Sequence, residues 1–133
     1  MADLTDLTWT SPDGLTLHAR DYAPAVETDR LPVICLHGLT RNARDFEDVA
    51  PRIAAMGRRV LAVDFRGRGR SDKAHDPMSY VPPVYAGDIV ALLSQAAIPK
   101  ALFIGTSLGG LVTLILAAMA PQAASAAMAA TVP

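Results

Sequence analysis

One serine lies in a sequence context that could make it a nucleophile. Ser107 lies in the sequence Gly-Thr-Ser-Leu-Gly-Gly at residues 105–110, after an apolar run that predicts a strand and before one that predicts a helix. A G-x-S-x-G pentapeptide in that context is typical of a nucleophile elbow, a strained turn that lifts the hydroxyl above the sheet edge. Gly105 and Gly109 meet the need for small neighbours two residues away on either side. We therefore predict that Ser107 is a nucleophile; the alternative interpretation is a glycine-rich packing turn.

A serine nucleophile needs hydrogen-bond donors for the oxyanion that its attack creates, and two backbone amides are candidates. Leu108 opens the predicted helix, where free N–H groups and the positive end of the helix dipole lie. Leu39 follows His37-Gly38 at the carboxyl end of another apolar strand, where ligands bind in open α/β sheets. Alone, this His-Gly pair favours a structural histidine; together with the elbow, it indicates an oxyanion hole.

The nucleophile also needs a base, and the sequence beyond Ser107 offers none. Residues 101–133 contain no Asp, Glu, Lys, Arg or His, so the 12 basic and 13 acidic side chains all lie earlier. We interpret His18 and His37 as structural, and His75, in a loop at the same end of the predicted sheet, is the one substitute. Without a base, a serine hydroxyl is a poor nucleophile.

The segment from Asp64 to Asp72, with the sequence Asp-Phe-Arg-Gly-Arg-Gly-Arg-Ser-Asp, follows a third apolar strand. Its Gly-Arg-Gly resembles part of a phosphate loop, but Asp72 stands where G-x-G-x-x-G needs its third glycine. Its three arginines, with Arg58 and Arg59, could instead bind an anion or a polynucleotide. Because aspartates are interleaved and no aromatic platform accompanies them, we favour a solvated structural loop.

The elements that must position these residues alternate along the chain. Residues 6–22 alternate apolar and polar side chains around Pro12-Asp13-Gly14, which predicts an antiparallel hairpin. Continuous apolar runs predict strands buried on both faces of a parallel sheet, and they are Val33–Leu36, Val60–Val63 and Ala101–Ile104. The apolar sequence Ala126–Val132 predicts a sixth strand.

Three helical patterns lie between these strands. The first begins after Asn42, a predicted N-cap, and ends at Gly57, with a break or kink expected at Pro51. Its apolar stripe consists of Phe46, Val49, Ile53 and Met56. The second follows Pro82-Pro83, and its stripe consists of Tyr85, Ile89, Leu92, Leu93 and Ala96. The third, Leu108–Met119, is apolar all round and predicts a central buried helix.

The amino-acid composition limits which classes of protein, partner and site are compatible with this sequence. The chain has 133 residues, a net charge of −1 and 51% hydrophobic residues, which indicates one compact domain and excludes a disordered chain. The near-neutral charge gives no reason to expect a nucleic acid partner. Cys35 is the single cysteine, which excludes an intrachain disulfide and a multi-cysteine metal site. The apolar stretch 101–120 could suggest a membrane span, but its glycine-rich turn and Pro121 argue against one. The acidic start Met1–Asp6 has no signal-peptide pattern, so we expect a cytoplasmic protein and no membrane partner.

Taken in order, three motifs resemble the α/β-hydrolase family: His37-Gly38 after a strand, D-x-R-G-x-G-x-S at residues 64–71, and the elbow at Ser107. The resemblance implies an α/β fold, a mostly parallel sheet with an N-terminal antiparallel hairpin and helices on both faces. It also implies a Ser–Asp/Glu–His triad, an oxyanion hole from the Leu39 and Leu108 amides, and no metal or organic cofactor. Serine at position 107, where dehalogenases and epoxide hydrolases of the family have aspartate, favours esterases, lactonases, carbon–carbon bond hydrolases or acyltransferases.

The family pattern places the triad acid and histidine after the serine, where this sequence has neither. We therefore expect residues 1–133 to be the N-terminal portion of a single α/β-hydrolase domain, without the cap and the C-terminal part of the core. The expected function is that of a serine hydrolase, esterase-like, acting on a small ester, lactone or related carbonyl through an acyl-enzyme on Ser107. A second polypeptide, or the C-terminal half, would supply Asp or Glu and His. The alternative is a catalytically inactive binding or interaction module that retains the first half of the fold.

Overall fold

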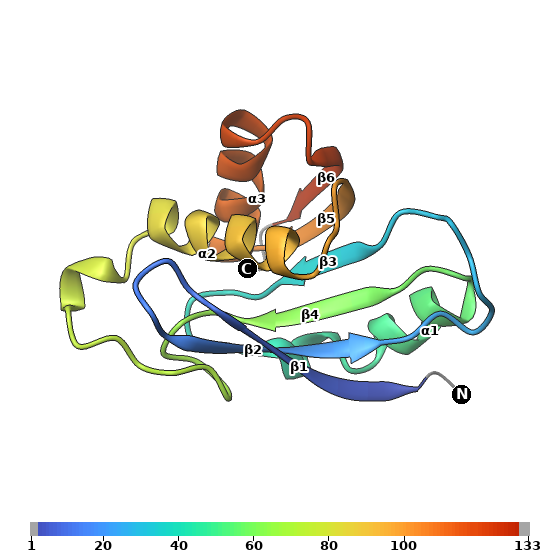
Figure 1. The fold of residues 1–133 in the computed structure, drawn as a ribbon, viewed down its shortest axis with the longest axis horizontal. Helices are drawn as coiled ribbons and strands as arrows, with labels where there is room; N and C mark the ends of the chain where they lie inside the picture. Colours follow the sequence, from blue (N-terminus) through green and yellow to red (C-terminus); the bar gives the residue numbers. More distant parts are fainter. Residues whose placement is uncertain (1–2, 131–133) are drawn as a thin grey trace.

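In a computed structural model of the protein, residues 3–130 are described, and they form a six-stranded sheet with the order β1-β2-β4-β3-β5-β6 (Figure 1). The strands are β1 (Leu4–Thr10), β2 (Thr16–Tyr22), β3 (Val33–Leu36), β4 (Val60–Asp64), β5 (Ala101–Thr106) and β6 (Ala124–Ala130). Strands β1 and β2 form an antiparallel hairpin, β2 is antiparallel to β4, and β3 to β6 are parallel to one another. The predicted mostly parallel sheet with an N-terminal hairpin is confirmed.

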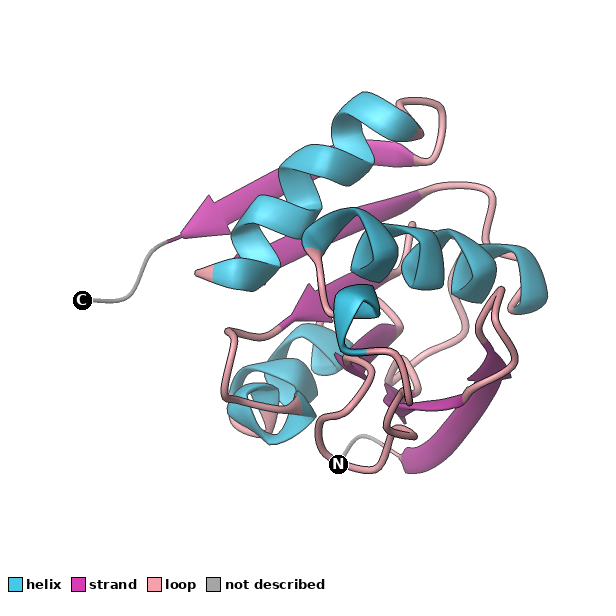
Figure 2. Cartoon of the chain, turned by 90° about the vertical axis from the view of Figure 1, so that its left-hand side faces the viewer, coloured by secondary structure: helices cyan, strands magenta, loops and turns pink. Residues whose placement is uncertain are grey.

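Helices cover both faces of this sheet, as predicted (Figures 1 and 2). They are η1 (Ala43–Phe46), α1 (Val49–Ala55), η2 (Pro77–Ser79), α2 (Pro82–Gln95) and α3 (Leu108–Met119). Helices α2 and α3 pack on one face, and η1 with α1 packs on the other, so the sheet separates two apolar cores. A parallel sheet needs this arrangement because the crossover connections lie on its faces.

The central strands are apolar without interruption because they serve both cores. In β3, Ile34 and Leu36 belong to the core under α2 and α3, whereas Val33 and Cys35 belong to the core under α1. The thiol of Cys35 lies in this second core, and burial raises its pKa to about 12. Such a thiol stays protonated and inert, so Cys35 acts as a small apolar side chain.

The predicted helix after Asn42 is two helices. Asn42 caps η1 as expected, because its side-chain oxygen accepts a hydrogen bond from the Arg44 N–H at 2.9 Å. The expected break at Pro51 is wrong: the interruption precedes Val49, and Pro51 sits in the first turn of α1, where an N–H would have no helical partner. The predicted apolar stripe is also partly wrong, since Val49 and Met56 are exposed and the alanines at positions 50 and 54 face the core.

Helix α3 differs from the sequence-based expectation on one face. It was predicted to be buried all round, yet Leu111, Leu114 and Met119 are exposed, because nothing within residues 3–130 packs against them. Neighbouring β6 forms the sheet edge, and all its residues after the first are exposed. The last two residues of the predicted strand 126–132 lie outside the described part of the chain. No helix of the described residues is long and apolar enough to cross a membrane.

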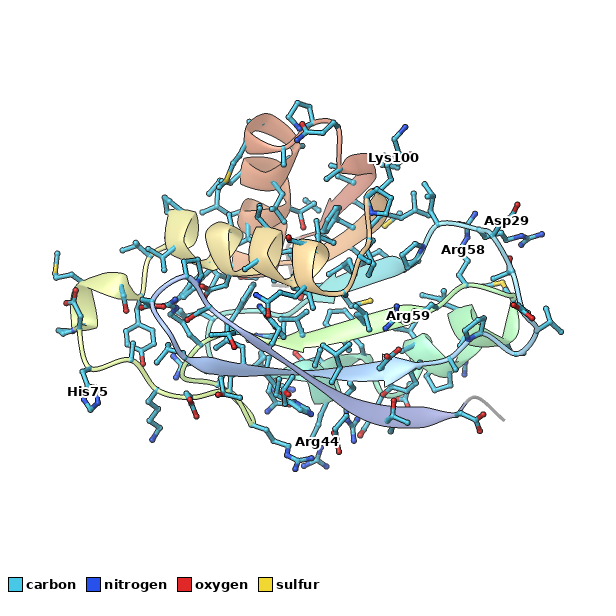
Figure 3. The ribbon with its side chains drawn as sticks, in the orientation of Figure 1. Asp29, Arg44, Arg58, Arg59, His75 and Lys100 are labelled. Atoms are coloured by element: carbon cyan, nitrogen blue, oxygen red, sulfur yellow. The ribbon has the colours of Figure 1, made fainter. Side chains whose placement is uncertain are left out.

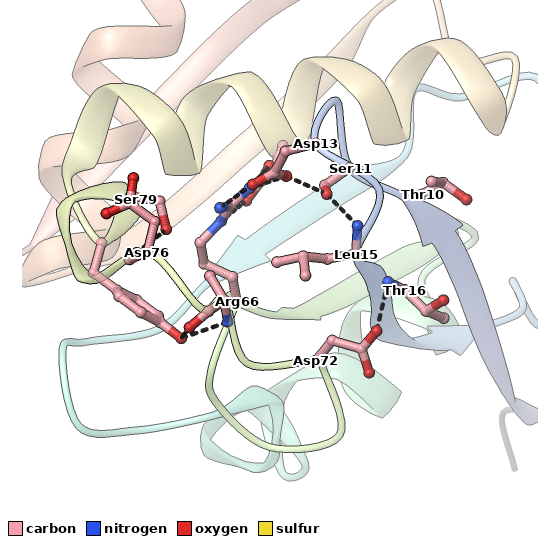
Figure 4. Close-up of polar contacts among 12 residues, drawn as sticks. Thr10, Ser11, Asp13, Leu15, Thr16, Arg66, Asp72, Asp76 and Ser79 are labelled. Carbon is pink, nitrogen blue, oxygen red and sulfur yellow. Dashed lines mark hydrogen bonds and ion pairs between the residues drawn. The ribbon is translucent and has the colours of Figure 1, made fainter.

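The segment 64–72 is a structural loop as predicted, but the expectation that it is solvated is wrong, because Asp64, Arg66 and Ser71 are buried (Figure 4). The buried guanidinium of Arg66 pairs with Asp88 of α2 at 2.7 Å and with Asp13 of the hairpin turn at 2.9 Å. Hydrogen bonds from Arg66 lower the pKa of Asp13 to about 2. Arg58 and Arg59 lie at the far end of β4, so the arginines do not form one basic patch (Figure 3).

Candidate active site

The site lies at a switch point of the sheet. Strand β3 is flanked by β4 on one side and β5 on the other, and the helices of the two crossovers, α1 and α2, cover opposite faces. In open α/β sheets, ligands bind beyond the carboxyl ends of the strands at such a point. Leu36 at the end of β3 pairs with Gly105 of β5, so the segments that follow, His37-Gly38 and Ser107, come side by side.

Ser107 forms a sharp turn between β5 and α3. Its φ of 53° and ψ of −116° lie in a region that residues with a side chain rarely adopt. The side chain is exposed, and the backbone N–H donates a hydrogen bond to the Ala130 carbonyl at 2.6 Å. The predicted elbow is therefore present as a backbone conformation, with the hydroxyl open to the surface.

The two glycines of the motif allow α3 to approach the strand ends. A Cβ on Gly109 would collide with the carbonyls of Leu36 and His37 at the end of β3. A Cβ on Gly105 would collide with the Gly109 carbonyl and the hydroxyl of Thr113. Because these obstacles are mostly backbone atoms that cannot move aside, positions 105 and 109 accept only glycine without rearrangement.

His37 orients the peptide unit that carries one candidate oxyanion donor. Its buried ring accepts the Phe65 N–H at Nε2 (3.0 Å), so the proton resides on Nδ1, which donates to the Gly38 carbonyl at 2.7 Å. Burial lowers the pKa of His37, which keeps the ring neutral. The Gly38 carbonyl and the Leu39 N–H belong to the same trans peptide and point in opposite directions. By holding that carbonyl, His37 fixes the direction of the Leu39 N–H.

A cavity of about 540 Å³ joins Ser107 to the Leu39 peptide, whereas Leu108, the other predicted oxyanion donor, is not among its lining residues. The cavity is lined by Gly38, Leu39, Thr40, Arg41, Asp45, Thr106 and Ser107. The amides of Leu39 and Leu108 donate no hydrogen bond to any acceptor within the described residues. Free amides beside a serine hydroxyl can stabilise a developing oxyanion. A metal ion, by contrast, has no group of three His, Cys, Asp or Glu side chains to hold it in residues 3–130.

The remaining histidines do not approach the serine. His18 lies between the carboxylates of Asp6 and Asp64, 2.7 Å from each, and does not line the Ser107 cavity. His75 is exposed on the loop before α2 and points away from the molecule, so it is not placed to act as the base (Figure 3). Both ring nitrogens of the neighbouring His37 are used by backbone groups, so within the described part of the chain no histidine is hydrogen-bonded to the Ser107 hydroxyl.

The sequence analysis missed three charged residues that lie around the turn from Gly38 to Arg41. Arg41 and Asp45 form an ion pair on the cavity wall, with 2.7 Å between Nη2 and Oδ1. Arg68 donates from Nε to the Leu39 carbonyl at 2.8 Å. The only sequence signal for the pair is the spacing of four between opposite charges. Its place in the cavity depends on the turn from Gly38 to Arg41, closed by a backbone hydrogen bond of 3.1 Å.

Comparisons with known proteins identify the family of the fold. The sequence model described as alpha/beta hydrolase fold matches residues 32–132. The chain is similar to the crystal structure of an alpha/beta hydrolase from Novosphingobium aromaticivorans, with 53% identity and a TM-score of 0.88 over 97% of this chain and 44% of that one.

Two curated relatives extend the comparison. The chain is 41% identical over 87 residues to a 3-hydroxybutyrate-oligomer hydrolase from Cupriavidus necator, covering 65% of this chain and 29% of that protein. It is 36% identical over 106 residues to a non-heme chloroperoxidase from Streptomyces lividans, covering 77% of this chain and 36% of that protein. The chain thus spans well under half the length of these relatives.

Proposed function

We propose a function from one premise, that this chain belongs to the alpha/beta hydrolase fold family. We infer that it carries the nucleophile of a serine hydrolase for a small ester, lactone or related carbonyl substrate. The Ser107 oxygen attacks the carbonyl carbon, and a base takes the hydroxyl proton. The Leu39 and Leu108 amides stabilise the oxyanion until the alcohol leaves and an acyl-enzyme remains. Water then hydrolyses the acyl-enzyme to the acid and regenerates the serine.

The conformation of Ser107 is the observation that carries this proposal. A non-glycine residue at φ 53° is strained, and such strain is kept where the surrounding structure holds it for a purpose. The strained turn presents the hydroxyl in the same cavity as the Leu39 peptide, whose orientation His37 fixes. A glycine-rich packing turn would need neither the exposed hydroxyl nor the adjoining free amides.

The base and the acid of the triad belong, in this proposal, to polypeptide outside the present sequence. Within residues 3–130, the Ser107 hydroxyl contacts no base, and the charge-free segment 101–133 supplies none. Either a second chain or the rest of a longer one would add the two residues. The open β6 edge and the exposed face of α3 are where that polypeptide would pack.

Labelling with a fluorophosphonate tests the nucleophile in the complete assembly. We expect one phosphonate per chain, at Ser107, because the reagent reacts with an activated serine and mimics the tetrahedral intermediate. Intact-mass spectrometry under denaturing conditions measures the label and detects any second polypeptide. The S107A variant should lose the label, and S94A, which removes an exposed hydroxyl on α2, should keep it.

The same experiment distinguishes the proposed hydrolase from the alternative, an inactive binding module. That alternative has one observation in its favour, the absence of a base beside Ser107 in the described residues. It predicts a folded protein that takes up no label even when every associated polypeptide is present. An unlabelled assembly would therefore overturn the proposed hydrolase.

A further inference from the structure

Arg41 stands beside the candidate nucleophile. A Cβ placed on Gly38 would lie 3.6 Å from the Cγ of Arg41 and also 3.6 Å from the Cβ of Ser107, so both side chains flank the same glycine. The Arg41 N–H donates to the Gly38 carbonyl at 3.1 Å, which fixes the base of the side chain. Two thirds of the side chain (66%) is exposed and its surface lines the cavity. A bound substrate would therefore meet this guanidinium.

Asp45 orients the guanidinium without occupying all of it. Nε and Nη2 of Arg41 donate to the Asp45 carboxylate at 2.7 to 3.1 Å, which uses one edge of the planar group. The Nη1 atom contacts no acceptor within residues 3–130. A guanidinium has five N–H donors in a rigid fork suited to carboxylates. Arg41 is thus held along one edge and presents free donors along another.

Three charged side chains lie around the turn from Gly38 to Arg41, and two of them, Arg41 and Asp45, line the cavity. Arg68 reaches the Leu39 carbonyl from the loop after β4, at the same end of the sheet. The other cavity-lining side chains are uncharged, and they are Leu39, Thr40, Thr106 and Ser107. Because the Asp45 carboxylate leaves part of the guanidinium unused, the cavity can hold a negative group of a substrate a few bonds from the scissile carbonyl.

We propose that Arg41 is a specificity-determining residue and that the substrate of Ser107 carries a carboxylate, which Arg41 binds while the carbonyl faces the Leu39 and Leu108 amides. The inference rests on the proposed function, since it assigns a substrate class to the same cavity. The bond between substrate and Arg41 is a charge-assisted hydrogen bond, and it selects anionic over neutral esters.

Binding of an unreactive ketone tests the inference without catalysis. The probe is 4-oxopentanoate, which has a carbonyl and a carboxylate but no ester bond, and its neutral counterpart is 4-oxopentanamide. Titration of the complete protein is followed by ¹H–¹⁵N shifts of the Leu39, Arg41 and Ser107 amides. We expect the wild type to bind the anion about tenfold more tightly, because a hydrogen bond to a charged group contributes about 1.4 kcal/mol or more.

Two variants sharpen the binding result. R41Q should bind both ketones equally, because the amide keeps hydrogen-bonding capacity without charge. R44Q removes a neighbouring exposed arginine that does not line the cavity, and it should keep the tenfold preference. Equal affinity of the wild type for the two ketones, or an unchanged preference in R41Q, would overturn the inference.

Kinetics separate this inference from the proposed function. With p-nitrophenyl hydrogen succinate and p-nitrophenyl butyrate, R41Q should lower kcat/KM for the anionic ester about tenfold and leave the neutral ester unchanged. Equal losses for both esters would mean that Arg41 serves only the oxyanion, which contradicts the inference. If the protein bound the anionic ketone selectively but hydrolysed neither ester, the result would support the carboxylate site at Arg41 and contradict the proposed hydrolase function.

Discussion

The histidine next to Gly38 links two loops through one neutral ring. Phe65 belongs to the loop after β4 and Gly38 to the loop after β3, and each uses one nitrogen of His37. Both partners are backbone groups in a buried place, where an unpaired N–H or C=O is costly. The orientation of the Leu39 amide and the stability of the chain therefore depend on the same side chain.

We expect H37A to lower the free energy of unfolding at pH 7 by about 2 kcal/mol, because it leaves the buried Phe65 N–H without a partner, whereas the Gly38 carbonyl keeps the Arg41 N–H. Urea unfolding followed by circular dichroism gives the value. The exposed His75 provides the control, since H75A should change stability by less than about 0.5 kcal/mol. Equal stability of the two variants would contradict the role given to His37.

The pH dependence of that difference follows from the lowered pKa of His37. Below about pH 6.5 the unfolded chain takes up a proton on this ring that the folded chain does not. The stability of the wild type therefore declines as the pH falls from 7 to 5.5, and H37A lacks this contribution to the decline. The gap between wild type and H37A should accordingly be smaller at pH 5.5 than at pH 7.

At the scale of elements, the contact between α3 and the strand ends depends on Gly109. We expect G109A to destabilise the fold by about 1–3 kcal/mol or more, because its Cβ would collide with the Leu36 carbonyl. Gly87 in α2 is the matched control, since a Cβ there meets nothing within 4 Å. G87A should stabilise the chain by about 0.5–1 kcal/mol through helix propensity. Thermal unfolding of both variants measures the contrast, and a stable G109A would refute the packing argument.

The elements themselves were predictable where burial leaves a clear pattern. The strand at 33–36 could be recognised because both of its faces are covered, which makes every residue apolar. The interruption between η1 and α1 could not be predicted, because the residues there, Glu47 and Asp48, are not helix breakers such as glycine or proline. Ser107 could be predicted as a site residue from the glycines around it. Arg41 could not, because it lies in the site only through the turn from Gly38 to Arg41, and no local sequence pattern indicates the geometry of that turn.

At the scale of the whole molecule, the main feature is the side formed by α3 and β6, which no other element of residues 3–130 covers. Helix α3 exposes an uncharged apolar face, which consists of Leu111, Leu114 and Met119. Met128 is exposed on the opposite face of β6, because its strand partner Ile104 faces the core under α1. Within residues 3–130, β6 leaves one edge unpaired. Lysines, prolines or bulges normally keep an edge strand from pairing with another chain. Strand β6 contains no lysine or proline, and its one register shift lies at its start, between Ala124 and Ala126. The sequence could predict that this half of the fold was incomplete, but it could not show which helix face would be left open.

We expect the chain on its own to associate with itself as its concentration rises, and L114K to reduce this association, because a charge on the open face disfavours apolar contact. Static light scattering across a concentration series gives the apparent mass. Met78 on η2 is even more exposed than Leu114 (76% against 58%) but lies outside the α3 face, so M78K should associate like the wild type. If L114K and the wild type gave the same masses, the α3 face would not be the contact.

The pairing of β5 with β3 has a consequence for the order of events in folding. Leu36 and Gly105 meet only after the chain between them has been closed into a long loop, and such closure is entropically costly and slow. The turn that strains Ser107 exists only once this contact is made. By contrast, β3 and β4 pair across a shorter stretch of chain, and the hydrogen bond between Phe65 and His37 joins the loops that follow these two strands. The geometry around Ser107 depends on contacts made by later segments, because β5 also pairs with β6 and the Ser107 N–H donates to the Ala130 carbonyl.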